Sequence, residues 1–339
     1  MAQVSPTTPE PPDAPAPMTA GGVVTLGETM ALLTVPSGRR LRSGTAAPVG
    51  FGGAESNVAI GLARLDVPVT WVSRVGDDAF GSMIIREIRG EGVQVLATVD
   101  PDARTGLMVK EHRHGTPWRI GYYRDGSAAS RLSAADLGPS ARAAITSARV
   151  LHLTGITPAL SDCAREAVHA AIGIARAAGV LVSFDVNYRA ALWPVRRAAP
   201  VLAELCAAAD VVFAGAAEAA LVLQVAPAAP EEELARGLAG LGAGTVVIKL
   251  GARGAMALTG GRIVTAAPDP IQVVDPIGAG DAFVAGYLSG LVAAAPVADC
   301  LRRGNRLGGA VCRVPGDWEG LPTHEELEHL DSTPEDVVR

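Results

Sequence analysis

The fold is decided by three short apolar runs, R-V-L-H-L at residues 149–153, V-L-V-S-F at 180–184 and D-V-V-F at 210–213. Alanine-rich helical patterns separate them over Arg165–Ala178 and Val195–Ala208. Strands that alternate with helices predict an α/β fold, in which a mostly parallel sheet is covered by helices on both faces.

Glycine and polar residues follow each of these runs. Gly155 follows the first run, Asp185 to Arg189 the second, and Gly215 to Glu218 the third. Ligands of such sheets bind beyond the carboxyl ends of the strands. We therefore expect the functional site at this edge of the sheet.

The residues before 149 have a different pattern. Three segments alternate apolar and polar residues between Gly and Pro, as hairpin strands do: Val23–Gly27, Ala31–Val35 and Gly106–Tyr123. Helical patterns lie between them, over Ala54–Leu65 and Asp78–Gly92. This predicts a small β lid, with strands from about residues 31–50 and 104–124, that interrupts the first part of the larger domain.

Length and composition are consistent with one large domain. With 339 residues and 49% hydrophobic content, the chain can bury a sizeable core. We expect the domain over residues 22–331, a disordered tail over 1–21 and a flexible tail over 332–339. No run of eighteen apolar residues occurs and no basic segment precedes an apolar one at the start, so neither a membrane span nor a signal peptide is expected.

Charge and cysteine content exclude further classes. A net charge of −6 argues against a nucleic-acid binder, which normally has a basic surface. The four cysteines are far apart and form no C-x-x-C pair, so neither a zinc site nor a disulfide framework is predicted. A reducing, cytoplasmic location is the expectation.

The strongest local motif is D-P-I-G-A-G-D at residues 275–281, which precedes a segment with apolar residues at helical spacing. This places Asp281 in the first turn of an amphipathic helix. The glycines Gly278 and Gly280 let backbone N–H groups, including that of Ala279, converge where the helix dipole favours negative charge. The same four residues are also compatible with a tight turn in which Asp281 is only a charge at the helix start.

An anion hole beside a carboxylate suits phosphoryl transfer. The migrating group needs positioned donors, and the attacking hydroxyl needs an acceptor for its proton. Asp281 is the candidate base; since its reference pKa of about 3.9 lies far below that of an alcohol, it takes the proton late, and its placement matters more than its basicity.

A second motif, G-G-A-E-S-N at residues 52–57, opens another helix. Gly53 permits close approach of a ligand, and Asn57 can donate to and accept from vicinal hydroxyls. A glycine turn followed by a polar helix start is the alternative. The chain has neither the G-x-G-x-x-G spacing nor any Gly-Lys dipeptide, so phosphate is not held by a dinucleotide fingerprint or a P-loop.

Together, G-G-A-E-S-N and D-P-I-G-A-G-D-A-F resemble the two signatures of the PfkB family of carbohydrate kinases, in order and in separation. The resemblance covers roughly residues 23–330. It implies a ribokinase-like three-layer α/β/α domain with a small β lid, ATP as phosphoryl donor and Mg²⁺ as cofactor.

Further segments resemble one branch of this family, the 2-keto-3-deoxygluconate kinases. They are Y-Y-R at 122–124, G-S-A-A-S at 126–130, T-G-I-T-P-A-L at 154–160, F-D-V-N-Y-R at 184–189 and G-D-W-E-G at 316–320. Arg124 and Arg189 can engage a carboxylate or phosphate bidentately, which suits an acidic sugar. Without the resemblance, both arginines would be read as solvated surface residues.

The resemblance implies a role for each matched position. The sugar acid would contact Gly53, Asn57, Tyr122 and Arg124, with Arg124 near its carboxylate, and Asp317 would help hold its hydroxyls. Arg189 would lie between the substrate and the transferred phosphate. The nucleotide would be lined by Asn187, by Lys249, Gly251, Arg253 and Gly254, and by Asn305 at the adenine, with the turn Gly278, Ala279 and Gly280 at the phosphates.

One position departs from the family pattern. The family carries N-x-x-E after the third strand, where the glutamate helps organise Mg²⁺ through water, whereas this chain has G-A-A-E at residues 215–218. Glu218 is kept and the asparagine is replaced by Gly215. Mg²⁺ is still expected, because it enters with ATP and keeps its waters, and the effect of the replacement on its affinity stays open.

The predicted activity is ATP-dependent phosphorylation of 2-keto-3-deoxy-D-gluconate at its terminal hydroxyl. A fructokinase, another sugar kinase of the family, and a catalytically inactive sugar or nucleotide sensor stay open as alternatives. A homo-oligomer that forms through the lid is expected, since exposed strand edges commonly pair between subunits. His112 and His114 are interpreted as part of an exposed lid hairpin rather than as metal ligands.

Overall fold

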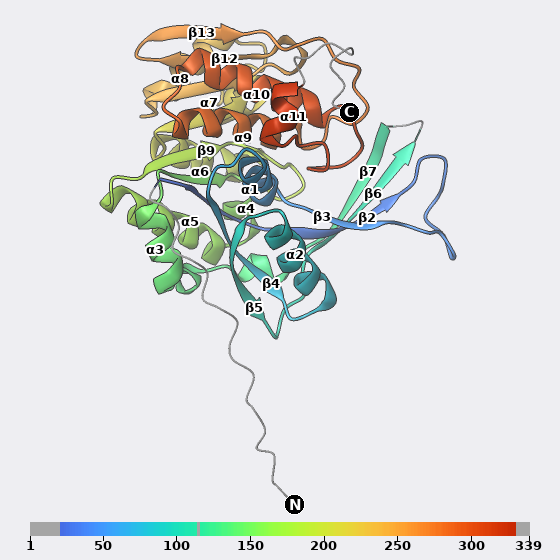
Figure 1. Cartoon of the computed structure of the whole chain (residues 1–339). Helices are drawn as coiled ribbons and strands as arrows, with labels where there is room; N and C mark the ends of the chain where they lie inside the picture. The colour runs from blue at the N-terminus through green and yellow to red at the C-terminus, as the bar shows by residue number, and fades with distance from the viewer. Residues whose placement is uncertain (1–20, 114–115, 330–339) are drawn as a thin grey trace, which may run out of the picture.

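A nine-stranded sheet lies at the centre of the part of the chain described by the computed structural model, residues 21–113 and 116–329 (Figure 1). Neighbouring strands are parallel except in the pairs β11–β12 and β12–β13. In spatial order the strands are β13 (Arg262–Ala266), β12 (Ala255–Thr259), β11 (Thr245–Lys249), β10 (Val211–Gly215), β9 (Leu181–Asp185), β8 (Val150–Thr154), β1 (Val23–Leu26), β4 (Val69–Gly76) and β5 (Gln94–Asp100).

Helices cover both faces of this sheet, each over its own apolar cluster. One cluster lies under α3 (Pro139–Ser147), α5 (Asp162–Ala177), α6 (Val195–Ala207), α7 (Ala216–Leu223) and α8 (Glu231–Gly240). The other lies under α1 (Ala54–Arg64), α2 (Ala79–Gly90), α9 (Ala279–Val292), α10 (Val297–Val311) and α11 (His324–His329). Short helical segments are α4 (Thr157–Leu160), η1 (Ala128–Arg131), η2 (Ala134–Asp136) and η3 (Gly251–Arg253).

The predicted α/β class with three layers is confirmed. The strands and helices expected between residues 149 and 213 lie within a few residues of their predicted bounds. The hairpin-like interpretation of Val23–Gly27 is wrong, because β1 lies inside the large sheet, parallel to β4 and β8. All four residues of β1 are buried, as a strand covered on both faces requires.

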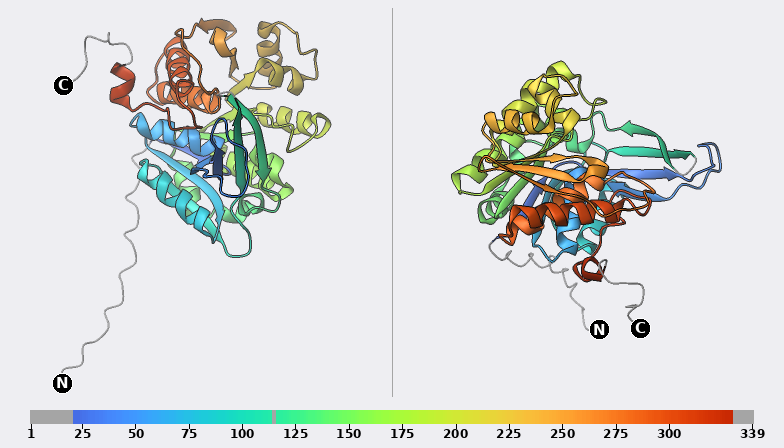
Figure 2. Two further views of the ribbon diagram at one scale, coloured as in Figure 1. Left: turned by 90° about the vertical axis from the view of Figure 1, so that its right-hand side faces the viewer. Right: turned by 90° about the horizontal axis from the view of Figure 1, so that it is seen from above.

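A second sheet of four strands, called the small sheet below, projects from one side of the domain (Figures 1 and 2). Its order is β3 (Val49–Gly52), β2 (Met30–Val35), β6 (Leu107–Arg113) and β7 (Thr116–Tyr123). β2 and β6 are parallel, the outer pairs are antiparallel, and the register between β6 and β7 shifts between Glu111 and His112. The small sheet is therefore built from two separate parts of the chain.

Asp281 lies on helix α9. The prediction that this helix is amphipathic is wrong. Every residue from Asp281 to Gly290 is buried, because α9 is packed between α1 and α10 as well as against the sheet. A helix that is apolar all round belongs in the interior. Asp281 is therefore presented from a helix that is held on all sides.

Two further expectations bear on the ends of the chain and on membranes. The tails predicted over residues 1–21 and 332–339 fall outside the described residues, apart from Gly21. Among the described helices, none is long and apolar enough to cross a membrane.

Candidate active site

The turn at residues 275–281 is shaped by Gly278, which precedes the first residue of α9. Its φ is +78°, in the left-handed region that favours glycine. A Cβ there would stand 1.8 Å from the carbonyl oxygen of Asp317, so the close approach of the loop after α10 also requires glycine. The Ala279 N–H donates to Pro276 O over a long 3.3 Å, and the N–H groups of Gly280 and Asp281 lie in the first helical turn, which offers no internal acceptor.

The carboxylate of Asp281 is buried between two asparagines from distant segments. Asn57 Nδ2 donates to Oδ2 at 2.8 Å and Asn187 Nδ2 to Oδ1 at 3.4 Å. Burial, with a smaller contribution from the charge of Asp185, raises the pKa of Asp281 to about 6, although the hydrogen bond from Asn57 and the charge of Arg189 act to lower it. Asn187 has a φ of +37°, an uncommon conformation that asparagine tolerates and that is often found at functional sites.

Lys249 lies under the same turn. Its Nζ donates to both carboxylate oxygens of Asp185, at 2.6 and 2.9 Å, and lies 3.6 Å from where a Cβ of Gly280 would stand. Burial opposes the charged ammonium, but the carboxylates of Asp185 and Glu218 outweigh it and raise the pKa of Lys249. A fixed positive charge is thus held close to the N–H groups that begin α9.

A cavity of about 640 Å³ begins at this turn and continues between η3 and α10. Such a volume is typical of a small-molecule site. Apolar side chains of Ile271, Val273 and Phe283 line it together with six of the predicted nucleotide residues: Lys249, Gly251, Gly254, Ala279, Gly280 and Asn305. Asn305 donates to Ala266 O at 2.9 Å, whereas Arg253 is not part of the lining and pairs with Glu231 at 2.6 Å.

Glu218 is fixed by two backbone donors. Its Oε2 accepts from Gly215 N at 2.7 Å and its Oε1 from Tyr188 N at 2.9 Å. These bonds tie the start of α7 to the segment after β9. Each oxygen has lone pairs left, so the carboxylate can still accept from water.

Arg124 is buried and paired, not exposed. Its guanidinium forms an ion pair with Glu28, whose Oε1 also accepts from Ser127 Oγ at 2.8 Å. The Arg124 Nε has no hydrogen-bond acceptor within the described residues. Tyr122 is half-exposed, with its ring centre 5.7 Å from the guanidinium carbon. Arginine and tyrosine therefore form one wall, in which the Arg124 Nε–H is a donor without an acceptor among the described residues.

The G-G-A-E-S-N motif begins α1 against the segment after β1. A Cβ on Gly53 would lie 2.2 Å from Glu28 O, so the chain can approach there only without a side chain. Glu55, two residues on, accepts from Thr154 Oγ1 at 2.7 Å and Thr157 Oγ1 at 2.8 Å. Burial raises the pKa of Glu55 to about 7 despite these bonds.

Asp317, the other predicted sugar ligand, is buried and forms an ion pair with Lys110 of β6 at 2.8 Å. Its Oδ2 lies 2.7 Å from where a Cβ of Gly52 would stand, so Asp317 lies beside the start of the G-G-A-E-S-N motif. Arg189 is exposed beyond β9, and its charge reaches Asp281.

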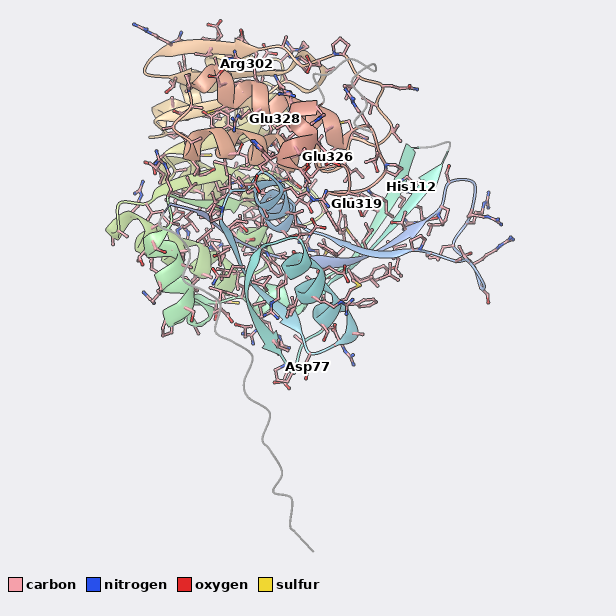
Figure 3. The ribbon with its side chains drawn as sticks, in the orientation of Figure 1. Asp77, His112, Arg302, Glu319, Glu326 and Glu328 are labelled. Atoms are coloured by element: carbon pink, nitrogen blue, oxygen red, sulfur yellow. The ribbon has the colours of Figure 1, made fainter. Side chains whose placement is uncertain are left out.

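The interpretation of His112 as exposed is wrong. Its side chain is buried, with Nε2 3.8 Å from Asp275 Oδ2, and Figure 3 shows it on β6 of the small sheet. The strand turns this face inward, towards the catalytic turn. His114 lies outside the described residues.

A comparison with protein families matches residues 21–324 to the family described as pfkB family carbohydrate kinase. The chain belongs to this family. The predicted membership is thereby confirmed, and so is the ribokinase-like fold, because solved kinases of this fold superpose over nine tenths of the chain.

The most similar relatives of this kinase include two 2-dehydro-3-deoxygluconokinases, the systematic name for 2-keto-3-deoxygluconate kinases. The Bacillus subtilis protein is 38% identical over 90% of this chain and 93% of its own length, and the Thermoproteus tenax protein is 38% identical over 91% and 93%. A 2-dehydro-3-deoxygalactonokinase of Haloferax volcanii is 34% identical over 91% and 96%.

Two solved structures illustrate the likeness. A PfkB protein from a Polaromonas species has a TM-score of 0.81 at 35% identity, covering 91% of this chain and 99% of that one. The 2-dehydro-3-deoxygluconokinase of Thermotoga maritima has a TM-score of 0.82 at 26% identity, covering 93% and 99%.

Two charged residues of the kinase site, Glu28 and Lys110, were missed from the sequence, and so was the ion pair of Asp185 with Lys249. Glu28 and Lys110 belong to no motif, and their partners are 96 to 207 residues away in the chain. The one available signal for Lys110 was rarity, since Lys110 and Lys249 are the only lysines in the sequence.

Proposed function

We propose that this kinase transfers the γ-phosphoryl group of ATP to the terminal hydroxyl of 2-keto-3-deoxy-D-gluconate, giving 2-keto-3-deoxy-6-phosphogluconate. The observation that carries the proposal is the hydrogen bond between Asn57 and Asp281, which joins the two signature motifs at one point. A hydroxyl held by Asn57 is within reach of Asp281 and of the N–H groups at the start of α9. The relatives that act on this sugar acid support the choice of substrate.

Asp281 accepts the proton of the attacking hydroxyl as its oxygen bonds to the γ-phosphorus and the bond to the ADP oxygen breaks. The N–H groups of Gly280 and Asp281, with that of Ala279 once released from Pro276, face the negative phosphoryl oxygens. Lys249 adds a fixed positive charge next to them. Arg189 approaches from the solvent side, between sugar and phosphate.

ATP occupies the cavity between η3 and α10, and its adenine base lies next to Asn305 and the apolar side chains. Mg²⁺ bound with the triphosphate would neutralise charge on the phosphate oxygens. Glu218 would hold the ion through water, since its carboxylate oxygens keep lone pairs after two backbone bonds. Within the described residues no group of three or more His, Cys, Asp or Glu is arranged to hold a metal ion by itself.

The small sheet serves as a lid over the sugar acid, and the Arg124–Tyr122 wall is its contact with the acid. Within the described residues its outer strands β3 and β7 each pair on one side only, with Val49 and Tyr123 exposed, and a second copy of the chain covers these edges in a homo-oligomer. A cytoplasmic location belongs to the proposal, since it supplies ATP and keeps the four free cysteines reduced.

A coupled ADP-release screen tests the substrate. Hexonate-derived 2-keto-3-deoxy acids, including the gluconate and galactonate epimers, are compared with fructose, other ketoses and nucleosides at one ATP concentration. We expect kcat/KM for the gluconate-derived acid to exceed that for fructose by at least about 100-fold, because an unpaired buried polar group strongly disfavours a substrate that lacks the carboxylate. ADP release that is faster with fructose would refute the substrate, and no release with any sugar would favour the sensor.

The rate of the kinase should depend on pH through Asp281. The base must be deprotonated, and its pKa near 6 means that protons compete with it below that pH. We expect kcat/KM to fall about tenfold per pH unit below pH 6 and to be flat between pH 7 and 8. A profile measured from pH 5 to 8 that stays flat to pH 5, as an ordinary aspartate would give, contradicts the assignment.

Gly215 provides a test of the magnesium requirement. Its φ of −73° is ordinary, and a Cβ would stand 3.4 Å from Glu218 Oε2, so asparagine can be accommodated. We expect Gly215→Asn to lower the half-saturating Mg²⁺ concentration by roughly threefold to tenfold, because the amide oxygen adds an acceptor for the ion's waters. Titration of Mg²⁺ at fixed ATP measures this, with Gly215→Ala as the control, and an unchanged requirement in the asparagine variant counts against a role for Glu218.

A further inference from the structure

Lys110 is a buried charge that no step of the proposed reaction uses. It lies on β6 of the small sheet, and its side chain is only 2% exposed. Its Nζ lies 2.8 Å from Asp317 Oδ1 and 3.3 Å from Asp275 Oδ2. The Lys110 ammonium of the small sheet therefore contacts two aspartates of the domain, Asp275 and Asp317.

Both aspartates hold the catalytic turn. Asp275 begins the turn, and its Oδ1 accepts from Ile277 N at 3.1 Å, while its Oδ2 accepts from Gly316 N at 3.4 Å. The backbone carbonyl oxygen of Asp317 packs against Gly278, at a point where a Cβ would not fit. The ammonium of Lys110 thus bridges the start of the turn and the loop that packs on its middle.

The charges make this bridge necessary. Lys110 is +1 and the two aspartates are −2, so these three side chains have a net charge of −1. Without Lys110, two buried carboxylates would face each other uncompensated, and such a loss is strongly destabilising. Repulsion would separate Asp275 from Asp317, and the loop could no longer keep its contact with Gly278.

We propose that Lys110 is a positioning residue for phosphoryl transfer, whose ammonium, brought in by the small sheet, holds the Asp275–Asp281 turn in the shape that binds the transferred phosphoryl group. The inference rests on the proposed function for the role of that turn. It couples the position of the small sheet to the anion hole, so that the sheet over the sugar also sets the geometry at the phosphate.

The first test compares Lys110→Met with Arg119→Met, which removes a positive charge from an exposed position on β7. For Lys110→Met we expect kcat to fall about 100-fold, as for a displacement of about 1 Å at a reacting centre, with the KM for ATP changed less than threefold. Hydrogen–deuterium exchange of residues 272–283 in the ligand-free protein should become faster. Arg119→Met should leave both quantities unchanged.

A second variant separates positioning from stability. Lys110→Met combined with Asp275→Asn keeps the cluster at −1, and the amide oxygen that Asp275→Asn introduces can still accept from Ile277 N. We expect its Tm to return towards that of the natural chain while kcat stays low, because nothing bridges the turn to Asp317. Recovery of kcat together with Tm would overturn the proposal, as would a Lys110→Met protein with normal kcat and normal exchange. If the natural chain phosphorylates no sugar, the proposed function fails, while the exchange of residues 272–283 still decides the coupling.

Discussion

Replacement of Asp281 by asparagine lowers kcat by roughly two to four orders of magnitude, as expected for the loss of a positioned base. Asparagine keeps the size of the side chain and can still bond to Asn57, so ATP should bind nearly as before. Steady-state kinetics with the sugar acid and a direct ATP-binding measurement check the two parts. Near-normal turnover would remove Asp281 from its catalytic role.

The same variant should be more stable than the natural chain. Asp281 has a pKa near 6 in the folded protein against 3.8 for a free aspartate, so the charged form is disfavoured by folding and its cost is present at pH 7. Asparagine removes that cost, on the order of 1–3 kcal/mol in the free energy of unfolding. Asp66→Asn is the control, because Asp66 is exposed in the turn before β4 and has a positive φ that asparagine accepts.

The second large effect is expected at Arg124, where two consequences have to be separated. Arg124→Leu leaves Glu28 buried without its cation, which costs about 3–5 kcal/mol of stability whatever the substrate. It also removes the donor that would bind the carboxylate of a sugar acid. The single variant therefore cannot distinguish a sugar-acid kinase from a fructokinase on activity alone.

A matched double variant resolves this. Glu28→Gln with Arg124→Leu removes both charges, so Tm should recover, whereas kcat/KM for the sugar acid should stay at least about 100-fold low. Activity on fructose, where detectable, should be reduced much less. Equal losses for the acid and for fructose would show that Arg124 supports the small sheet rather than the carboxylate.

The fold was largely predictable because its information is local. Each strand between residues 149 and 213 is covered by helices on both faces of the sheet, which requires a short, nearly continuous apolar run. Such a run can be recognised from the sequence alone. The failures came from context. β1 has the length of a hairpin strand but lies at the centre of the large sheet, and α9 is buried by α1 and α10, which no pattern within α9 reveals.

The candidate site was predictable in part for the same reason. The motifs at residues 52–57 and 275–281 are continuous, and the structure brings Asn57 to Asp281. The ion pairs Lys110–Asp317 and Arg124–Glu28 join segments with no spacing rule between them. Residue type alone suggested that Arg124 was a free cation for a ligand, but its charge is already balanced by a neighbour that the sequence did not point to.

The packing of Asp317 on Gly278 also has a consequence for how the protein is made. The glycine turn is translated well before the loop that closes over it, and Trp318 then anchors that loop by donating to Phe51 O at 3.1 Å, a residue from the first part of the chain. A nascent chain therefore cannot complete the phosphate site until Asp317 and Trp318 have left the ribosome as well.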